Sequence, residues 1–292
     1  MPDPLILRNH RFAWGDRTYI QGILNVTPDS FSDGGEFATV TAALAQGKRL
    51  VAAGADILDV GGQSTRPGAE TISLEAELNR VIPAIAALRA ELDLPISVDT
   101  TRAVVAEAAI AAGADLINDI SGATYDPNLL TTAARLQVPV ILMHLRGTPA
   151  TMSSLTDYGD LIGEISRFLG ERLAAALAAG LDKSQVILDP GLGFAKNYQQ
   201  NLELLRRVRE FRALGTAILV GPSRKRFIGQ ILQQDDPKQR VWGTAAACCA
   251  AIAGGADLLR VHDVAEMVQV ARVADAIWRG DLPPTDKSPS DR

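Results

Sequence analysis

Polar side chains stand at or near the ends of the apolar segments of this chain, and their types could bind a polar heterocycle or an anion. Each one alone has a simpler explanation, because Asp and Asn are common at turns and a single His is often a hydrogen-bonded structural residue. Gathered in one place without a ligand, their like charges would be costly. We therefore interpret the set as a ligand site; it comprises Asn25, Asp59, Asp99, Asn118, His144, Asp189, Arg260 and His262.

A glycine-rich loop follows Asp189 over residues 189–196. Gly191 and Gly193 would let the backbone approach a ligand closely, and Phe194 could form an apolar or stacking wall. The alternative is an ordinary turn with a core phenylalanine, and the loop alone does not decide between the two.

Three consecutive cations, Arg224, Lys225 and Arg226, lie within residues 221–229. A run of charge is usually a solvated face, but this run follows a strand whose end should lie beside the ligand site. We expect Lys225 to be the side chain that points inward.

Three further groups could hold a diphosphate through charge-assisted hydrogen bonds: Arg66, Arg260 and His262. The histidines and cysteines of the chain lack the spacing of a zinc site. Magnesium that bridges Asn25 and substrate phosphates remains possible. There is no phosphate-binding loop of the Gly-x-x-x-x-Gly-Lys type and no convincing dinucleotide fingerprint.

The apolar segments read as eight buried strands, with near-continuous apolar runs that are typical of parallel strands covered on both faces. Amphipathic helical patterns lie between them. This alternation predicts a closed (β/α)8 barrel, and a doubly wound open sheet is the alternative. The expected strands are 19–24, 57–59, 96–99, 116–118, 138–143, 186–188, 217–220 and 258–261, and the clearest helices are 40–53, 74–88, 101–112, 158–179 and 265–278.

Residues 1–280 are predicted to form one domain, and the Pro-rich, charged segment 281–292 a disordered tail. Residues 5–20 should form a β-hairpin that turns tightly at Gly15-Asp16. One short motif, a joint between helix and strand, occurs three times, and each copy places a glycine after a predicted helix and directly before the next predicted strand. The copies are Ala53–Asp56, Ala112–Asp115 and Gly254–Asp257.

The composition is that of a globular enzyme, with 47% hydrophobic and 22% charged residues. The net charge of -5 argues against a nucleic-acid partner. No segment is predicted to span a membrane or to act as a signal peptide, so we expect a reducing cytoplasm. Cys248 and Cys249 lie in an Ala-rich helical pattern and are interpreted as small core residues on different faces, without a disulfide.

Several separated motifs resemble those of the dihydropteroate synthases, the folate-pathway enzymes that join a pterin to p-aminobenzoate. The resemblance extends from about residue 5 to about residue 278, and the order of the motifs makes chance a poor explanation. It is carried by residues 25–35, 59–67, 97–100, 118–122, 143–149, 189–196, 223–229 and 260–263. Small departures at residues 121–123 and 145–146 put only loop detail in doubt.

The resemblance implies a role for each motif residue. The pterin would bind to Asp99, Asn118, Asp189 and Lys225, in a pocket lined by Met143, Phe194 and Gly221. Asn25 would meet Mg²⁺ and the diphosphate, which Arg66, Arg260 and His262 would also hold. The p-aminobenzoate site, which sulfonamides would share, would comprise Phe31, Thr65, Pro67, Phe194, Ser223 and Lys225.

The implied reaction is displacement of diphosphate from 6-hydroxymethyl-7,8-dihydropterin diphosphate by the aryl amine, which gives 7,8-dihydropteroate. The family mechanism is dissociative and needs no covalent enzyme intermediate. Arg66, Lys225, Arg260 and His262 are the groups expected to act in it, through positioning of the reactants and stabilisation of the departing anion. Family members are usually homodimers.

Three other functions compete with this interpretation. A corrinoid-dependent methyltransferase pterin domain would share the barrel, but it would not need the Ser-Thr-Arg-Pro loop or the Ser-Arg-Lys stretch. Lys225 could instead be the Schiff-base lysine of an aldolase, although the many cations suited to phosphate and the lack of a second buried lysine argue against it. A pterin-binding protein without turnover is the third alternative.

Overall fold

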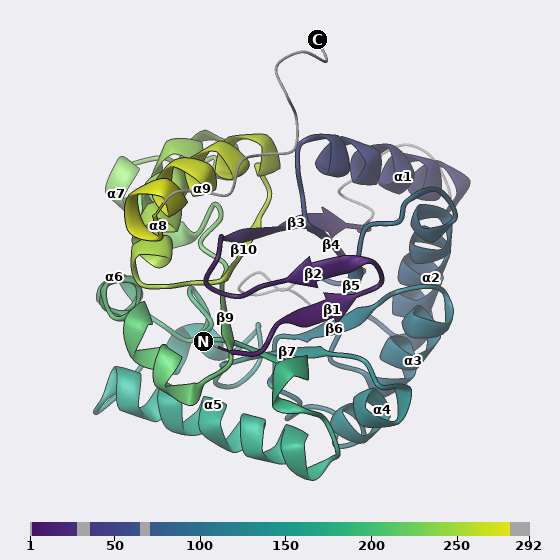
Figure 1. Ribbon diagram of the computed structural model, residues 1–292, viewed down its shortest axis with the longest axis horizontal. Helices are drawn as coiled ribbons and strands as arrows, with labels where there is room; N and C mark the ends of the chain where they lie inside the picture. The colour runs from purple at the N-terminus through teal and green to yellow at the C-terminus, as the bar shows by residue number, and fades with distance from the viewer. Residues whose placement is uncertain (1, 28–35, 65–70, 281–292) are drawn as a thin grey trace.

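The fold places eight parallel strands in a closed barrel, as the alternation of strands and helices predicts, rather than in an open doubly wound sheet (Figure 1). The computed structural model describes residues 2–27, 36–64 and 71–280. Neighbouring strands follow the order β10-β3-β4-β5-β6-β7-β8-β9, so β10 closes the barrel against β3 and β9. The strands are β3 Tyr19–Asn25, β4 Ile57–Gly61, β5 Ile96–Asp99, β6 Leu116–Asp119, β7 Val140–Met143, β8 Val186–Asp189, β9 Ala217–Val220 and β10 Leu258–Val261.

Helices surround the barrel and bury one apolar face each against the strands (Figure 1). They are α1 Glu36–Ala52, α2 Leu74–Glu91, α3 Ala103–Ala111, α4 Leu129–Leu136, α5 Leu161–Ala178, α6 Tyr198–Arg206, α7 Arg226–Leu232, α8 Val241–Ala253 and α9 Val264–Trp278. Short 3-10 turns lie at Met152–Ser154, Lys183–Gln185, Val208–Leu214 and Pro237–Arg240. In the described part of the chain, no helix is long and apolar enough to cross a membrane.

The predicted boundaries differ from the observed ones where side chains cap a helix or a turn intervenes. The helix expected from residue 158 begins at Leu161 because the Asp160 carboxylate caps it, accepting the Gly163 N–H at 3.0 Å. The strand expected from residue 138 begins at Val140, since the left-handed Gln137 turns the chain after α4.

The N-terminal hairpin is present, but it does not turn at the predicted position, since the turn that Gly15 and Asp16 do form lies between Trp14 and Arg17, after the two paired strands. Strands β1 Leu5–Leu7 and β2 His10–Phe12 pair in antiparallel fashion and turn at residues 8–9, so Gly15 and Asp16 lie beyond the hairpin and Tyr19 already belongs to the barrel. Leu5, Leu7 and Phe12 pack with Trp14, Tyr19 and apolar barrel residues in one buried cluster. The hairpin therefore covers one end of the barrel (Figure 1).

The three predicted joints share one geometry at the amino ends of the strands. Their glycines Gly54, Gly113 and Gly255 have φ values of +98°, +110° and +85°, which an L side chain rarely adopts. The Asp of each joint accepts the backbone N–H of a neighbouring strand through Oδ2: Ile20 bonds to Asp56 at 2.8 Å, Ile96 to Asp115 at 2.8 Å, and Ile218 to Asp257 at 3.1 Å.

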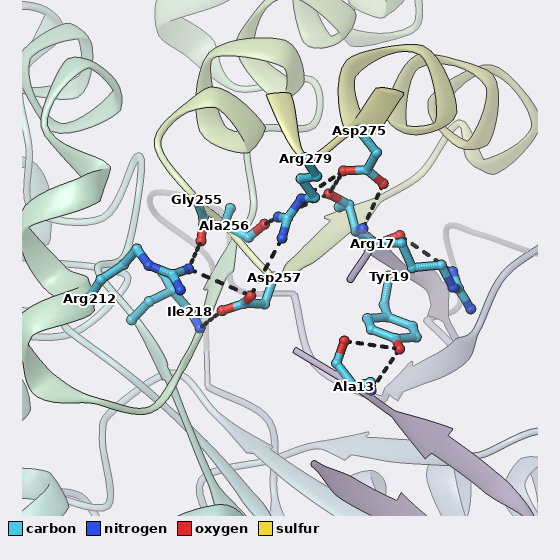
Figure 2. A network of polar contacts seen from close by, with 11 residues as sticks. Ala13, Arg17, Tyr19, Arg212, Ile218, Gly255, Ala256, Asp257, Asp275 and Arg279 are labelled. Carbon is cyan, nitrogen blue, oxygen red and sulfur yellow. Dashed lines mark hydrogen bonds and ion pairs between the residues drawn. The ribbon is translucent and has the colours of Figure 1, made fainter. Parts of the chain in front are cut away.

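Arginines neutralise these carboxylates, which explains how the end of the barrel tolerates them. Asp257 lies between Arg212 and Arg279, whose guanidinium nitrogens are 3.7 Å and 3.9 Å from its Oδ1 (Figure 2). Arg17 pairs with Asp56 at 2.6 Å. These groups lie at the opposite end of the strands from the carboxyl ends, so we assign them to stability rather than to the ligand site.

Cys248 is buried in α8 and Cys249 is exposed, and both are free thiols. The expectation that they face different sides of one helix is confirmed, but Cys249 is not a core residue. The predicted tail 281–292 lies outside the described residues.

Candidate active site

Four strands bring polar side chains into one network at their carboxyl ends. Arg260 of β10 donates from Nε to Oδ2 of Asp59 at 2.6 Å and from Nη2 to Oδ2 of Asp99 at 2.7 Å. Asn118 of β6 donates from Nδ2 to the same Asp59 oxygen at 3.1 Å. The prediction that these strand-end residues lie together is confirmed, and they contact one another directly.

Asp59 is the residue of this network that the sequence placed in the ligand-site set without a specific role. Its side chain is fully buried, and Ser97 donates its hydroxyl proton to Oδ1. Ser97 in turn accepts a hydrogen bond of 2.8 Å from Gln21. The available signal was a carboxylate inside the apolar segment 57–61, because a buried charge needs several partners.

Burial shifts the protonation of the two carboxylates assigned to the pterin. It raises the pKa of Asp99 to about 7, and although Arg260 opposes this shift, Asp59 adds to it. It raises the pKa of Asp189 to about 6. The Gly191 N–H that Asp189 accepts at 2.7 Å and the charge of Lys225 both act in the opposite direction and lower this pKa. Burial thus raises the pKa of both carboxyls, and upward shifts of this kind are common at functional sites.

Lys225 points inward, as predicted, and its two neighbours do not. Its Nζ lies 4.1 Å from the centroid of the Phe194 ring, a cation–π contact. Burial lowers the pKa of Lys225 to about 8. Arg224 instead donates to Asp263 with its Nε at 3.0 Å, and Arg226 is exposed.

The loop after β8 approaches the Lys225 stem so closely that only glycine fits. A Cβ on Gly193 would lie 2.8 Å from Cδ of Lys225, and its φ of +83° already disfavours other residues. Phe194 belongs to a small buried apolar cluster that includes Met143. The interpretation of this loop as part of a site, rather than a plain turn, is thereby favoured, and Phe194 and Met143 supply its apolar wall.

A second buried lysine, Lys196, lies in this loop, so the expectation that the chain lacks one is wrong. Lys196 donates to the carbonyl of Phe194 at 2.8 Å, and its Nζ lies 3.0 Å from Nδ1 of His144. Burial lowers the pKa of Lys196 to about 7. The charge of a lysine at the end of a glycine-rich loop was the available signal, but its inward direction depends on the turn at Ala195, whose φ is +48°.

Ser223 and His262 are hydrogen-bonded partners. Ser223 Oγ accepts the backbone N–H of His262 at 3.1 Å and lies 2.9 Å from its Nδ1. Since that oxygen already accepts one proton, its own hydroxyl proton can be donated to Nδ1, which would leave the ring proton on Nε2. The role of Ser223 at a p-aminobenzoate site stays a prediction.

The remaining predicted residues are placed as follows. Asn25 ends β3, half-buried, and pairs with Gly61 of β4. A Cβ on Gly221 would lie 3.8 Å from Cβ of Arg260, so Gly221 lies beside the network. Phe31, Thr65, Arg66 and Pro67 lie outside the described residues.

Among residues 2–27, 36–64 and 71–280, no group of three or more His, Cys, Asp or Glu side chains could hold a metal ion. A metal retained by the protein alone would need such a group, whereas Mg²⁺ is usually bound by one or two protein oxygens together with substrate phosphates and water. The carboxamide oxygen of Asn25 fits that second arrangement.

Fold and site define a (β/α)8 barrel protein that presents buried carboxylates, a carboxamide and cations to a ligand at the carboxyl ends of its strands. The family model described as "Pterin binding enzyme" matches residues 21–262. The chain belongs to this family of pterin-binding enzymes and, within it, to the dihydropteroate synthases.

Relatives from several bacteria support this assignment. A protein of Synechocystis sp. named dihydropteroate synthase is 60% identical over 278 residues, which cover 95% of this chain and 96% of the relative. The solved structure of the Xanthomonas albilineans dihydropteroate synthase with 4-aminobenzoic acid has a TM-score of 0.88 and 46% identity, and the match covers 95% and 98% of the two chains. The Yersinia pestis enzyme with a sulfonamide drug has a TM-score of 0.88 and 42% identity, with 94% and 99% covered.

Proposed function

We propose that this chain condenses 6-hydroxymethyl-7,8-dihydropterin diphosphate with p-aminobenzoate to give 7,8-dihydropteroate and diphosphate. The observation that carries the proposal is the buried network of Asp59, Asp99, Asn118 and Arg260, which offers both hydrogen-bond acceptors and a cation at the carboxyl ends of adjacent strands. The names of the relatives give dihydropteroate as the product and 4-aminobenzoic acid as a ligand of one of them.

Asp99, Asn118, Asp189 and Lys225 are the proposed partners of the pterin ring edges. A 2-amino-4-oxo pterin presents N–H donors side by side, and the ionised Asp189 carboxylate can accept two of them. Lys225 has only donors and therefore suits the ring acceptors. Phe194, Met143 and Gly221 would form the walls that exclude water.

Arg260 and His262 are proposed to bind the diphosphate with Arg66. Arg260 uses Nε and Nη2 on the two carboxylates, and Nη1 remains to face an anion. His262 would add the Nε2 proton that its contact with Ser223 leaves there. These donors would stabilise the charge that develops on the departing diphosphate.

Asn25 is the proposed protein ligand of Mg²⁺. When bound, the ion supplies positive charge beside the diphosphate oxygens. Mg²⁺ usually keeps several waters and binds through one or two protein oxygens together with substrate phosphates, so we expect magnesium to bind together with the diphosphate.

The p-aminobenzoate site is proposed to lie between the loops after β3, β4 and β9. Phe31, Thr65 and Pro67 would contribute from the first two loops, and Ser223 and Lys225 from the third, with Phe194 alongside. Lys225 would then touch both substrates and hold them in line. Sulfonamides should compete here, since the related Yersinia pestis enzyme has been solved with such a drug.

The aryl amine is uncharged at neutral pH, so it can attack without a general base. In the proposed dissociative order, the C–O bond to diphosphate breaks first, and the amine nitrogen then bonds to the exocyclic carbon and loses its proton to solvent. Catalysis by this chain would consist of orientation and stabilisation of the leaving anion, without a covalent enzyme intermediate.

A homodimer is proposed from an exposed apolar surface on α7, α8 and α9, three helices that lie together in Figure 1. The Trp242 side chain is 79% exposed at the start of α8 and the Trp278 side chain is 60% exposed at the end of α9, and exposed tryptophans are typical of surfaces that bind another protein. Ile231, Val273 and Ile277 are exposed on the same helices. The two free thiols fit a reducing compartment, and we propose the cytoplasm.

Diphosphate release and dihydropteroate formation, followed by mass, test the proposed reaction. Product should form only with dihydropterin diphosphate, p-aminobenzoate and magnesium together. Pterin binding without product would support the methyltransferase domain or the non-catalytic binding protein instead. Trapping of Lys225 by borohydride with a carbonyl substrate would support the aldolase. Lys225→Met should be inactive, and Lys238→Met, which changes an exposed lysine, is the matched control.

A further inference from the structure

One carboxylate oxygen lies between the pterin-binding and the diphosphate-binding side chains. Oδ2 of Asp59 accepts from Nδ2 of Asn118 at 3.1 Å and from Nε of Arg260 at 2.6 Å. We infer that Asp59 is the positioning residue that orients Asn118 and Arg260 together, so that ring recognition and departure of the diphosphate depend on one side chain. This inference rests on the proposed function.

The contact with Asn118 decides which end of the carboxamide faces the ligand. A carboxamide has one end that donates and one that accepts. Nδ2 points to Asp59 and gives it one of its two N–H groups, so Oδ1 lies on the other branch of the amide, where we expect it to accept an N–H from the pterin. Without a negative partner at Nδ2, the amide could rotate and present the wrong group.

The contact with Arg260 fixes the plane of the guanidinium. Nε bonds to Asp59 and Nη2 to Asp99, on adjacent strands β4 and β5, and two such contacts leave a planar fork little freedom. The direction of Nη1 is thereby fixed, although Nη1 takes part in neither of these two hydrogen bonds. A single carboxylate would leave the guanidinium free to rotate about one bond.

Asp59 is itself held rigidly, as a positioning residue must be. Its side chain is fully buried, its second oxygen accepts the Ser97 hydroxyl, and Ser97 is fixed by Gln21 at 2.8 Å. Gln21, Asp59 and Ser97 lie on three successive strands, β3, β4 and β5; Asp59 pairs with Ser97, whereas Gln21 pairs with Ile57, two residues before Asp59. Figure 1 shows these strands side by side in the barrel wall.

Asp59→Asn keeps the shape and removes the charge, so it is the variant of choice. The first measurement is the affinity for 6-hydroxymethyl-7,8-dihydropterin, without diphosphate, in the wild type, Asp59→Asn, Asn118→Ala and the double variant. We expect Asp59→Asn to weaken binding about 10- to 100-fold. In the Asn118→Ala background the same change should have almost no further effect, because the amide that Asp59 orients is gone. Independent, multiplicative effects would overturn the inference.

The second measurement separates kcat from KM for the pterin diphosphate. Loss of a negative charge next to Arg260 would by itself favour the binding of an anion there. If Asp59 acts only through its charge, Asp59→Asn should therefore have an unchanged or higher kcat. Loss of orientation predicts a kcat about 10-fold lower or more. An unchanged kcat with a raised KM would overturn the Arg260 half of the inference.

Ser97→Ala provides a second route if Asp59→Asn fails to fold. It removes the donor to Oδ1 of Asp59 and leaves Oδ2 with both of its partners. We therefore expect a smaller loss of pterin affinity than in Asp59→Asn, and no such loss in the Asn118→Ala background. A loss that persists there contradicts the inference. If the wild type binds no pterin at all, the proposed function fails instead, and the two failures are therefore distinguishable.

Discussion

Lys196 Nζ lies 3.0 Å from Nδ1 of His144, and both side chains are buried. When Lys196 is charged, its ammonium has only donors, so Nδ1 accepts and the imidazole is neutral, with its proton on Nε2. Burial, together with the charge of Lys196, lowers the pKa of His144 to about 2. The pair therefore ties the loop after β8 to the end of β7 with a single buried cation.

This buried cation should give the protein an unusual pH dependence of stability. Burial lowers the pKa of Lys196 from 10.5 to about 7, so between these values the unfolded chain holds a proton that the folded chain has lost. The free energy of unfolding contributed by Lys196 therefore rises with pH across that window. Lys196→Met lacks this pH-dependent contribution. The difference in free energy of unfolding between the wild type and Lys196→Met, measured by urea denaturation, should therefore grow from pH 7 to pH 10. Lys238→Met, at an exposed lysine, should show a constant difference; a flat profile for Lys196→Met would contradict the prediction.

Asp189 should make pterin affinity depend on pH below neutrality. Burial raises its pKa to about 6, and only the ionised carboxylate can accept two ring N–H groups. Wild-type affinity for 6-hydroxymethyl-7,8-dihydropterin should therefore fall as the pH drops from 7 to 5. Asp189→Asn should bind about 10- to 100-fold more weakly at pH 7 and lose this part of the pH dependence. Calorimetric titration measures both, and unaltered affinity in the variant would remove Asp189 from the site.

Arg260→Ala should depress turnover and also destabilise the fold. The second effect follows from the structure, because the change leaves Asp59 and Asp99 buried without their cation, at a cost of about 3 kcal/mol. The double variant Arg260→Ala/Asp59→Asn should be more stable than Arg260→Ala, because one of the two buried, unpaired carboxylates is then neutral. Its turnover should stay low. Thermal melting and initial rates separate the effects; a double variant less stable than Arg260→Ala would refute the pairing.

Gly191→Ala should disrupt the loop that carries Phe194. Its φ is +72°, and a Cβ would lie 2.0 Å from the carbonyl oxygen of His144, an atom of the backbone that cannot move aside. We expect a loss of about 2–4 kcal/mol in the free energy of unfolding, together with weaker pterin binding. Gly215→Ala is the matched control: its φ is +73°, but its Cβ would meet only the end of the Lys183 side chain, at 2.6 Å. Equal losses in the two variants would mean that the clash does not matter.

Removal of magnesium should abolish turnover while leaving binding of the bare pterin intact. Asn25 supplies only one oxygen, so the ion is expected to arrive with the diphosphate. Titration of 6-hydroxymethyl-7,8-dihydropterin with and without a chelator measures this, with the pterin diphosphate as the comparison. A chelator effect on the bare pterin would instead indicate a metal site that exists before the substrate binds.

The sequence by itself determined the barrel and most of the polar side chains that gather at its carboxyl end. Eight apolar runs separated by amphipathic helices can bury their faces in few other ways, and the polar residue at the end of each run must then lie at one end of the barrel. Asp99, Asn118, Asp189 and Arg260 could be chosen for that reason, Lys225 was chosen from the run of cations after β9, and the Gly-Ala-Asp joints were visible as repeats.

Only the tertiary structure decided which of these side chains touch one another. Arg260 meets Asp59 and Asp99 because strand pairing brings β10, β3, β4 and β5 around one barrel wall, a closure that no local pattern encodes. The inward turn of Lys196 and the partnership of Ser223 with His262 likewise join residues 39 or more positions apart. The hairpin turn was misplaced because Gly15-Asp16 has the local preference for a turn, whereas packing of Phe12 and Trp14 over the barrel end decides where the strands pair.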